Sequence, residues 1–124
     1  MGQPAAKQGD HITALDTHLI QTGIGAAPMT FPFDGIIDGG LSSNVQIEGR
    51  PAATVGSTAT NTPPHIGSFV NPPSNQGQIL FGSTSVLING QPAARSGDTA
   101  LTCNDPVDLP VGTVVASSTV SIGG

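Results

Sequence analysis

The sequence has few of the residues that usually stabilise a small domain. Its 124 residues include four Phe, no Trp, no Tyr and one Cys, so large core side chains are scarce and an internal disulfide framework is excluded. Only Lys7, Arg50 and Arg95 are basic, and the net charge is −5. Because nucleic-acid binding requires a basic surface, the sequence excludes nucleic acid as a partner.

Long hydrophobic runs and helical patterns are also absent. No stretch is long enough for a membrane-spanning helix, and the N-terminus lacks the charged start and apolar stretch of a signal peptide. We therefore expect a protein made in the cytoplasm that leaves the cell, if it does, by another route than standard secretion. No dozen residues free of Gly and Pro repeat with a helical period, and the length favours one domain.

What the sequence does contain is a tripled motif. The block Pro-Ala-Ala occurs at residues 4–6, 51–53 and 92–94, each time followed by two residues and a Gly. The position after that Gly is Asp in the first and third copies but Ser57 in the second. Three copies of one short unit predict approximate three-fold internal symmetry, which would match the end of a three-fold partner.

A second repeated unit lies upstream of the motif. Residues 45–49 and 86–90 both read Val-x-Ile-x-Gly, an alternation typical of a strand that runs into a turn. The third copy of this unit is at the opposite end of the chain, in residues 120–124. We therefore predict one domain, residues 1–124, closed on itself with the C-terminal strand 119–124 beside the N-terminus.

The remaining segments favour an all-β fold. Short strand-like runs come in pairs ahead of each motif, and each pair is interpreted as a hairpin. The segments after the motif, residues 10–20, 57–67 and 98–107, are expected to be irregular. Two connectors rich in Pro and Gly, residues 23–34 and 69–76, are expected to be loops. The prediction is a small conical domain of β-hairpins with three-fold pseudosymmetry and loops that converge on one apex.

The metal-binding side chains follow the repeat. His18 and His65 each lie fourteen residues after the proline of their own repeat, and Cys103 is near the same place in the third. If the repeats surround one axis, these three meet at a pole, with His11 as a fourth group. Three imidazoles and one thiolate form a complete tetrahedral set for zinc, which would cross-link distant segments of a thin apex.

Two alternatives remain at this point. The histidines could be ordinary surface residues of loops, with Cys103 a small buried side chain. The bound ion could also be iron or another metal instead of Zn²⁺.

The tripled Pro-Ala-Ala-x-x-Gly with loops bearing His and Cys resembles the PAAR-repeat family over essentially the whole chain. The resemblance implies the pointed tip of the central spike in contractile injection systems: type VI secretion, extracellular phage-tail-like particles and some phage tails. It implies a sharp β-rich cone whose base caps a trimeric (VgrG-like) spike protein, one tip per trimer. It also implies an apical zinc held by three His and one Cys, a set that matches His11, His18, His65 and Cys103.

The leading functional hypothesis is therefore mechanical. A zinc-stabilised tip would cap the spike, contact the target membrane transiently and help to pierce it, as part of a particle outside the cell or carried into the target. An alternative is an adaptor that attaches effectors without a covalent link, through residues 23–34 with Phe31 and Phe33, unless these rings pack locally.

The other alternative is a small zinc enzyme, with Asp10, Asp16 or Asp105 as a general base near the metal. Four protein ligands would close the coordination sphere, and the sequence shows no cluster of aromatics that would form a deep pocket. We therefore expect no catalytic residues.

Overall fold

The computed structural model describes residues 2–123, and every regular element in that range is a β-strand, which confirms the all-β prediction. The described range has no helix long and apolar enough to cross a membrane. In chain order the strands are β1 (Gln3–Pro4), β2 (His11–Thr22), β3 (Gly25–Gly39), β4 (Gln46–Ile47), β5 (Arg50–Pro51), β6 (Thr58–Asn61), β7 (Gln76–Ile79), β8 (Leu87–Ile88), β9 (Gln91–Pro92), β10 (Thr99–Thr102), β11 (Leu109–Val115) and β12 (Ser121–Ile122).

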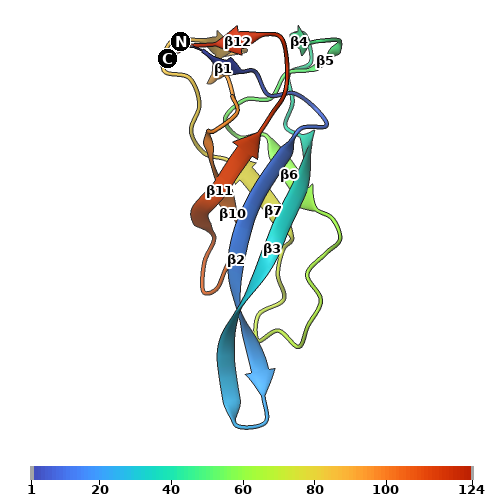
Figure 1. Cartoon of the computed structure of the whole chain (residues 1–124), viewed down its shortest axis with the longest axis vertical. Coiled ribbons are helices and arrows are strands. Elements are labelled where there is room, and N and C mark those ends of the chain that lie inside the picture. Colours follow the sequence, from blue (N-terminus) through green and yellow to red (C-terminus); the bar gives the residue numbers. More distant parts are fainter. Residues whose placement is uncertain (1, 124) are drawn as a thin grey trace.

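The six strands of four or more residues form a closed antiparallel barrel in the order β10–β11–β2–β3–β6–β7. Figure 1 shows a body that narrows from a broad base, where β1, β4, β5 and β12 lie, to the turn of the β2–β3 hairpin. β2 and β3 pair from His11 opposite Ile36 to Thr22 opposite Gly25. This hairpin extends beyond the rest of the barrel, and Ile24 in its turn is fully exposed.

Three short two-stranded sheets form the base: β4–β5, β8–β9 and β1–β12. Two of them have two-residue turns, Glu48-Gly49 and Asn89-Gly90, in which both residues have positive φ. This conformation is the type I′ turn, whose twist matches that of a hairpin. The first two Val-x-Ile-x-Gly strands therefore each pair with the residues directly after them, up to the Pro of the motif. The predicted pairing with an earlier strand is wrong, because β3 pairs with β2 and β6 instead.

The third basal sheet joins the two ends of the chain. Gln3 of β1 lies opposite Ile122 of β12, and Pro4 lies opposite Ser121. The backbone N–H of Ala5 also donates to the carbonyl oxygen of Val120 at 2.8 Å. Gly124, the last residue of the third Val-x-Ile-x-Gly unit, is outside the described residues, as is Met1.

The three Pro-Ala-Ala blocks meet around one axis through a closed ring of backbone hydrogen bonds. Ala6 donates to Ala94 at 3.0 Å, Ala94 to Ala53 at 3.1 Å, and Ala53 to Ala6 at 3.0 Å. All six alanines of the motif are at most 1% exposed. The six methyl groups are therefore packed inside the protein close to the axis, where a small side chain lets the three repeats approach one another.

The turn that follows each motif is closed by one side chain. In every repeat the residue after the Gly accepts the backbone N–H of the residue three positions earlier: Lys7 to Asp10 Oδ2 at 3.0 Å, Thr54 to Ser57 Oγ at 3.0 Å, and Arg95 to Asp98 Oδ2 at 2.7 Å. Ser57, which departs from the sequence pattern, thus makes the same hydrogen bond as the two aspartates.

The apolar interior has two parts. A basal cluster lies under the three basal sheets and consists of Ala5, Val45, Ile47, Ala52, Ile88, Ala93 and Ile122. The barrel cluster lies on the apex side of it and is built around Ile12, Phe33, Ile37, Ile79 and Val114 with the inner alanines. Since Phe33 is 2% exposed and belongs to β3, the predicted loop over residues 23–34 is wrong. Residues 11–20 likewise lie in β2, so the segment after the first motif is not irregular.

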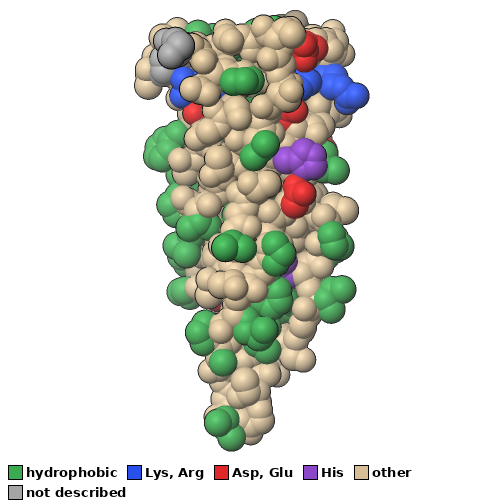
Figure 2. All heavy atoms as spheres, viewed as in Figure 1, with side chains coloured by type: hydrophobic (Ala, Val, Ile, Leu, Met, Phe, Trp, Pro, Cys, Tyr) green, Lys and Arg blue, Asp and Glu red, His purple; other side chains and the backbone are tan. Residues whose placement is uncertain are grey.

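Charge is distributed unevenly along the cone. In Figure 2 the Lys and Arg side chains gather around the base, and none is seen on the narrow half. The two segments that form most of that half, residues 17–33 and 62–76, contain no Asp, Glu, Lys or Arg. The fold therefore places the basic side chains at the base, while these two segments toward the apex carry no charge.

The alanine ring gives the first prediction. Replacing Ala53 by Leu forces extra carbon atoms into a site that is 0% exposed, and overpacking of this kind costs about 1–3 kcal/mol. The matched control is Ala26→Leu on the exposed part of the β2–β3 hairpin. Chemical denaturation should show a large loss of stability for the first variant and little change for the second. Equal losses would contradict the structural role of the ring.

Candidate metal centre

Four side chains that can bind a metal converge inside the narrow half of the barrel. Asp16, His18, His65 and Cys103 each offer one ligand atom, and these atoms all lie within 4.8 Å of one another. Asp16 and His18 come from β2, Cys103 directly follows β10, and His65 lies in the long connection between β6 and β7. The cluster therefore ties together three segments that are far apart in sequence.

The alternation of β2 brings its two residues to the cluster. Side chains two positions apart in a strand share a face, and Ile12, Ala14, Asp16 and His18 all point inward, with Asp16 and His18 at most 1% exposed. Near the base this inward row is apolar and contributes to the core. Toward the apex it becomes polar, so the same strand supplies first the core and then the site.

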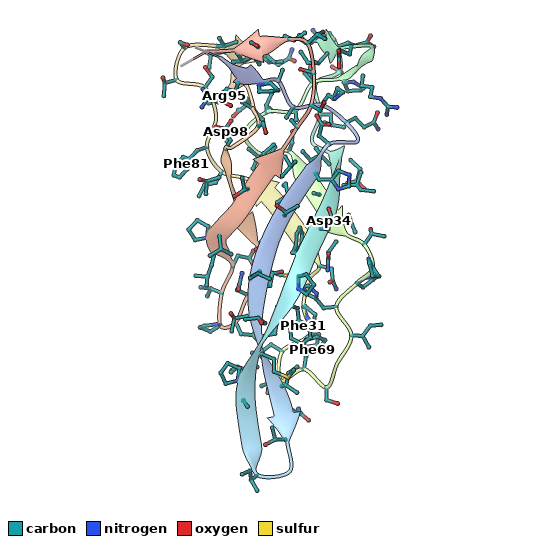
Figure 3. The ribbon with its side chains drawn as sticks, viewed as in Figure 1. Phe31, Asp34, Phe69, Phe81, Arg95 and Asp98 are labelled. Atoms are coloured by element: carbon teal, nitrogen blue, oxygen red, sulfur yellow. The ribbon has the colours of Figure 1, made fainter. Side chains whose placement is uncertain are left out.

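His65 is positioned by the loop around it. Its backbone N–H donates to Asn75 Oδ1 at 2.9 Å, and Asn61 Nδ2 lies 3.2 Å from its Nδ1. Phe31 and Phe69, labelled in Figure 3, pack against both the cluster and each other, with ring centroids 5.3 Å apart. The centroid of Phe31 is 5.8 Å from that of His18 and 5.3 Å from that of His65. Phe31 thus packs locally against the cluster, and Phe33 is buried in the barrel core.

Asp16 lies at the centre of the hydrogen bonds that join the cluster. Its Oδ1 accepts from the Thr102 hydroxyl at 2.5 Å and from Asn104 Nδ2 at 3.5 Å. Its Oδ2 is 2.9 Å from His65 Nε2 and 3.4 Å from Cys103 Sγ. One carboxylate oxygen is thereby held by neutral donors, and the other faces the imidazole and the thiol.

His18 shows that the cluster fits a metal ion. Both of its ring nitrogens, Nδ1 and Nε2, are buried without a hydrogen-bond partner, and within residues 2–123 no other buried side-chain nitrogen or oxygen lacks one. Leaving a buried polar group without a hydrogen bond costs about 1–3 kcal/mol. The carboxylate of Asp105 is 3.7 Å from Nδ1, which favours a proton on that nitrogen and leaves the Nε2 lone pair free. A metal bond would satisfy Nε2.

The distances and charges agree with this interpretation. Ligand atoms of a tetrahedral zinc site, bound at 2.0–2.3 Å, are about 3.3–3.7 Å apart, so the observed set needs adjustments of about 1 Å. Two buried groups, the carboxyl of Asp16 and the thiol of Cys103, carry negative charge once ionised. A divalent cation would neutralise both, which matters because an uncompensated buried charge is strongly unfavourable.

The structure does not place His11 with the other three predicted ligands. It lies at the start of β2, where its Nδ1 is 2.6 Å from Asp34 Oδ1 on the outer surface. His11 and His18 are seven residues apart in one strand, which corresponds to about 23 Å and to opposite faces of the sheet. A single ion cannot contact both, and Asp16 stands in the place that His11 was expected to fill.

The sequence contained a signal for Asp16. Its position two residues before His18 puts both side chains on one face if residues 10–20 form a strand. With residues 10–20 expected to be irregular, Asp16 is predicted only as a possible general base near the ligands. Asp16 was therefore missed as a ligand because the secondary structure of residues 10–20 was predicted wrongly, and not because a carboxylate is an unsuitable ligand.

Comparison with known proteins agrees with the repeat and the fold. Two overlapping matches to the PAAR motif family cover residues 1–107 and 70–124, and thus the whole chain. The chain belongs to the PAAR motif family. No curated protein shows significant similarity to the sequence. Membership of a family of structural spike components supports a place in the spike of a contractile injection system, and the candidate metal centre lies in the narrow half of this PAAR domain.

The electrostatics of the centre predict a pH dependence. Burial, and secondly the charge of Asp16, raise the pKa of the Cys103 thiol to about 11. A pKa that is higher in the folded state stabilises the fold below the unfolded pKa, and this contribution is lost as pH rises through the folded value. For the metal-free protein we therefore expect the free energy of unfolding to fall between about pH 9 and pH 11, by at most about 3 kcal/mol.

Denaturation of metal-free protein at several pH values measures this loss. The Cys103→Ala variant is the control, because the ionisation of every other group continues while the thiol is gone. The same slope in both proteins would show that the thiol has an ordinary pKa in the fold.

Proposed function

We propose that this PAAR domain is the metal-stabilised tip of the central spike of a contractile injection system. Its base caps the three-fold end of a trimeric spike protein, one tip per trimer, and its apex is the first part to meet the target membrane when the system fires. The observation that carries the proposal is the closed ring of Ala6, Ala53 and Ala94, which gives a single chain the symmetry of a trimer.

The base supports this role by its shape and chemistry. The three basal sheets are related by the ring, so each can meet one of three identical edges of the spike. The inner side of these sheets carries Ile47, Ile88 and Ile122, all buried in the basal cluster. The outer side is left for contact with the partner. Short strands with free edges are well suited to backbone pairing with another sheet, and such pairing also protects them from aggregation.

The metal centre supports the role of the apex under load. Asp16, His18, His65 and Cys103 would hold Zn²⁺, a structural ion whose bonds add on the order of 10 kcal/mol to the stability of small domains. Four protein ligands close the coordination sphere, which fits a structural role better than catalysis. The ion would fix the long loop between β6 and β7 to the β2–β3 hairpin at the point where the barrel narrows.

The surface of the apex fits contact with a membrane. The narrow half lacks charged residues over residues 17–33 and 62–76, and exposed Ile24 occupies the turn at its end. Charged side chains resist transfer into the bilayer interior by several kcal/mol each. A neutral tip with an apolar end therefore meets less resistance during forced insertion than a charged one.

The capping role predicts a defined complex. Co-expression with the spike protein from the same injection system should give a stable complex that contains one tip chain for each spike trimer, measured by mass spectrometry of the intact assembly. Changes on the outer face of a basal hairpin, such as Leu87→Glu, should weaken the complex without unfolding the isolated tip. A tip that fails to bind the trimer, or that binds in three copies, would contradict the proposal.

The metal centre predicts a measurable ion. The purified protein should contain one zinc per chain by elemental analysis, and the double variant His65→Ala with Cys103→Ser should lose most of it and melt at a lower temperature. His11→Gln is the matched control, because His11 lies away from the cluster, and it should keep its zinc. Full zinc content in the double variant, or zinc loss in the control, would refute the assigned ligands.

A further inference from the structure

The three repeats meet at three equivalent interfaces near the base, and two of these are filled by a basic side chain. The residue directly after Pro-Ala-Ala is Lys7 in the first repeat, Thr54 in the second and Arg95 in the third. These residues occupy the same place in the fold, since each forms a β-bridge with the first motif alanine of the neighbouring repeat: Lys7 with Ala52, Thr54 with Ala93, and Arg95 with Ala5.

Lys7 and Arg95 show how this place is normally filled. Lys7 Nζ is 3.1 Å from Asp10 Oδ1 and donates to the carbonyl oxygen of Ser117 at 2.6 Å. Arg95 is paired with Asp98 at 2.9 Å, and its Nη1 donates to the carbonyl oxygen of Gly123 at 3.2 Å. Each cation is therefore partly buried at a repeat interface and bonded to a backbone carbonyl there.

The second repeat lacks both members of the ion pair. Thr54 and Ser57 stand where the other repeats have a basic and an acidic residue, and Ser57 Oγ is already bonded to the backbone of Thr54 and to the carbonyl oxygen of Gly40 at 2.8 Å. A hollow of about 290 Å³ remains at this interface, lined by Gly40, Leu41, Ser42, Ser43, Thr54, Ile88, Asn89 and Gln91.

The hollow keeps the polar groups that bind the cation elsewhere. By the repeat, Ser42 has the position of Ser117, and Asn89 has the position of Gly123. Their carbonyl groups are thus at the places that accept from Lys7 and Arg95. The side chain of Asn89 adds an oxygen at this edge, which accepts from the Ser42 hydroxyl at 2.5 Å. The site has the shape and acceptors for a basic group but no basic residue of its own.

We propose that this hollow, between the second and third repeats, binds a Lys or Arg side chain of a partner protein. The two filled interfaces of the same molecule indicate the chemistry of the occupant. The net charge of −5 favours the approach of a basic segment. Because only one of the three interfaces has this hollow, a partner that binds there can distinguish the three rotational orientations of the pseudosymmetric base. The proposal does not depend on the identity of the partner as a spike.

The test is an NMR titration of the ¹⁵N-labelled full chain with the blocked peptide acetyl-Gly-Arg-Gly-amide. The amide signals of Gly40, Ser42 and Asn89 should shift in a saturable way, while those at the other two interfaces stay in place. A peptide with citrulline instead of arginine has nearly the same shape without the charge. It should bind at least about tenfold more weakly, a ratio that corresponds to 1.4 kcal/mol.

Filling the hollow provides the matched control. The double variant Thr54→Arg with Ser57→Asp recreates the ion pair of the other repeats, leaves the net charge unchanged, and should abolish the response to the peptide. Thr54→Arg alone also fills the hollow and serves as a second variant in case the double change disturbs the turn. Thr30→Arg adds the same charge on the exposed β2–β3 hairpin, away from the hollow, and should keep the response to the peptide. The proposal is overturned if shifts at the hollow do not saturate, if citrulline binds equally, or if the filled variants respond like the parent.

Discussion

The structure depends on three backbone hydrogen bonds that join Ala6, Ala94 and Ala53 in a closed ring. Each bond links two repeats, so the ring holds together segments that are about forty or more residues apart in sequence. Because the bonds are buried, an unmade one would leave a polar group without water, which costs about 1–3 kcal/mol. The ring fixes the three basal sheets on one side and the starts of the barrel strands on the other, and thereby sets the shape of the cone.

The narrow end is organised by a different principle. There the barrel interior is too thin for a large apolar core, and the inward row of β2 changes from Ile12 to Asp16 and His18. Stability in this region comes from polar groups that converge from three segments, with Phe31 and Phe69 packed around them. The cluster and the ring are thus complementary: backbone bonds close the base, and a metal ion would close the apex.

The features that lie within the repeated units could be predicted from the sequence. The alternation in Val-x-Ile-x-Gly and the tripled motif were sufficient to predict strands, pseudosymmetry and the convergence of His18, His65 and Cys103. The partner of each short strand was not predictable, because Gln46 and Ile47 pair across a two-residue turn instead of with a longer strand. The positions of both His11 and Asp16 depend on whether residues 11–20 form a strand. That segment contains no Gly or Pro and has four β-branched residues, so its composition already favoured a strand.

The sequence by itself determined the number of repeats, the all-β class and the set of residue types that can bind a metal, because these follow from local spacing and composition. Only the tertiary structure decided which of those residues meet. It places Asp16 instead of His11 in the cluster because inward and outward faces alternate along β2. It also shows a hollow at Thr54, since the basic side chains of Lys7 and Arg95 occupy the equivalent places in the other two repeats. In both cases the deciding quantity is the direction in which a side chain points, and the chain acquires that direction only when distant strands pair.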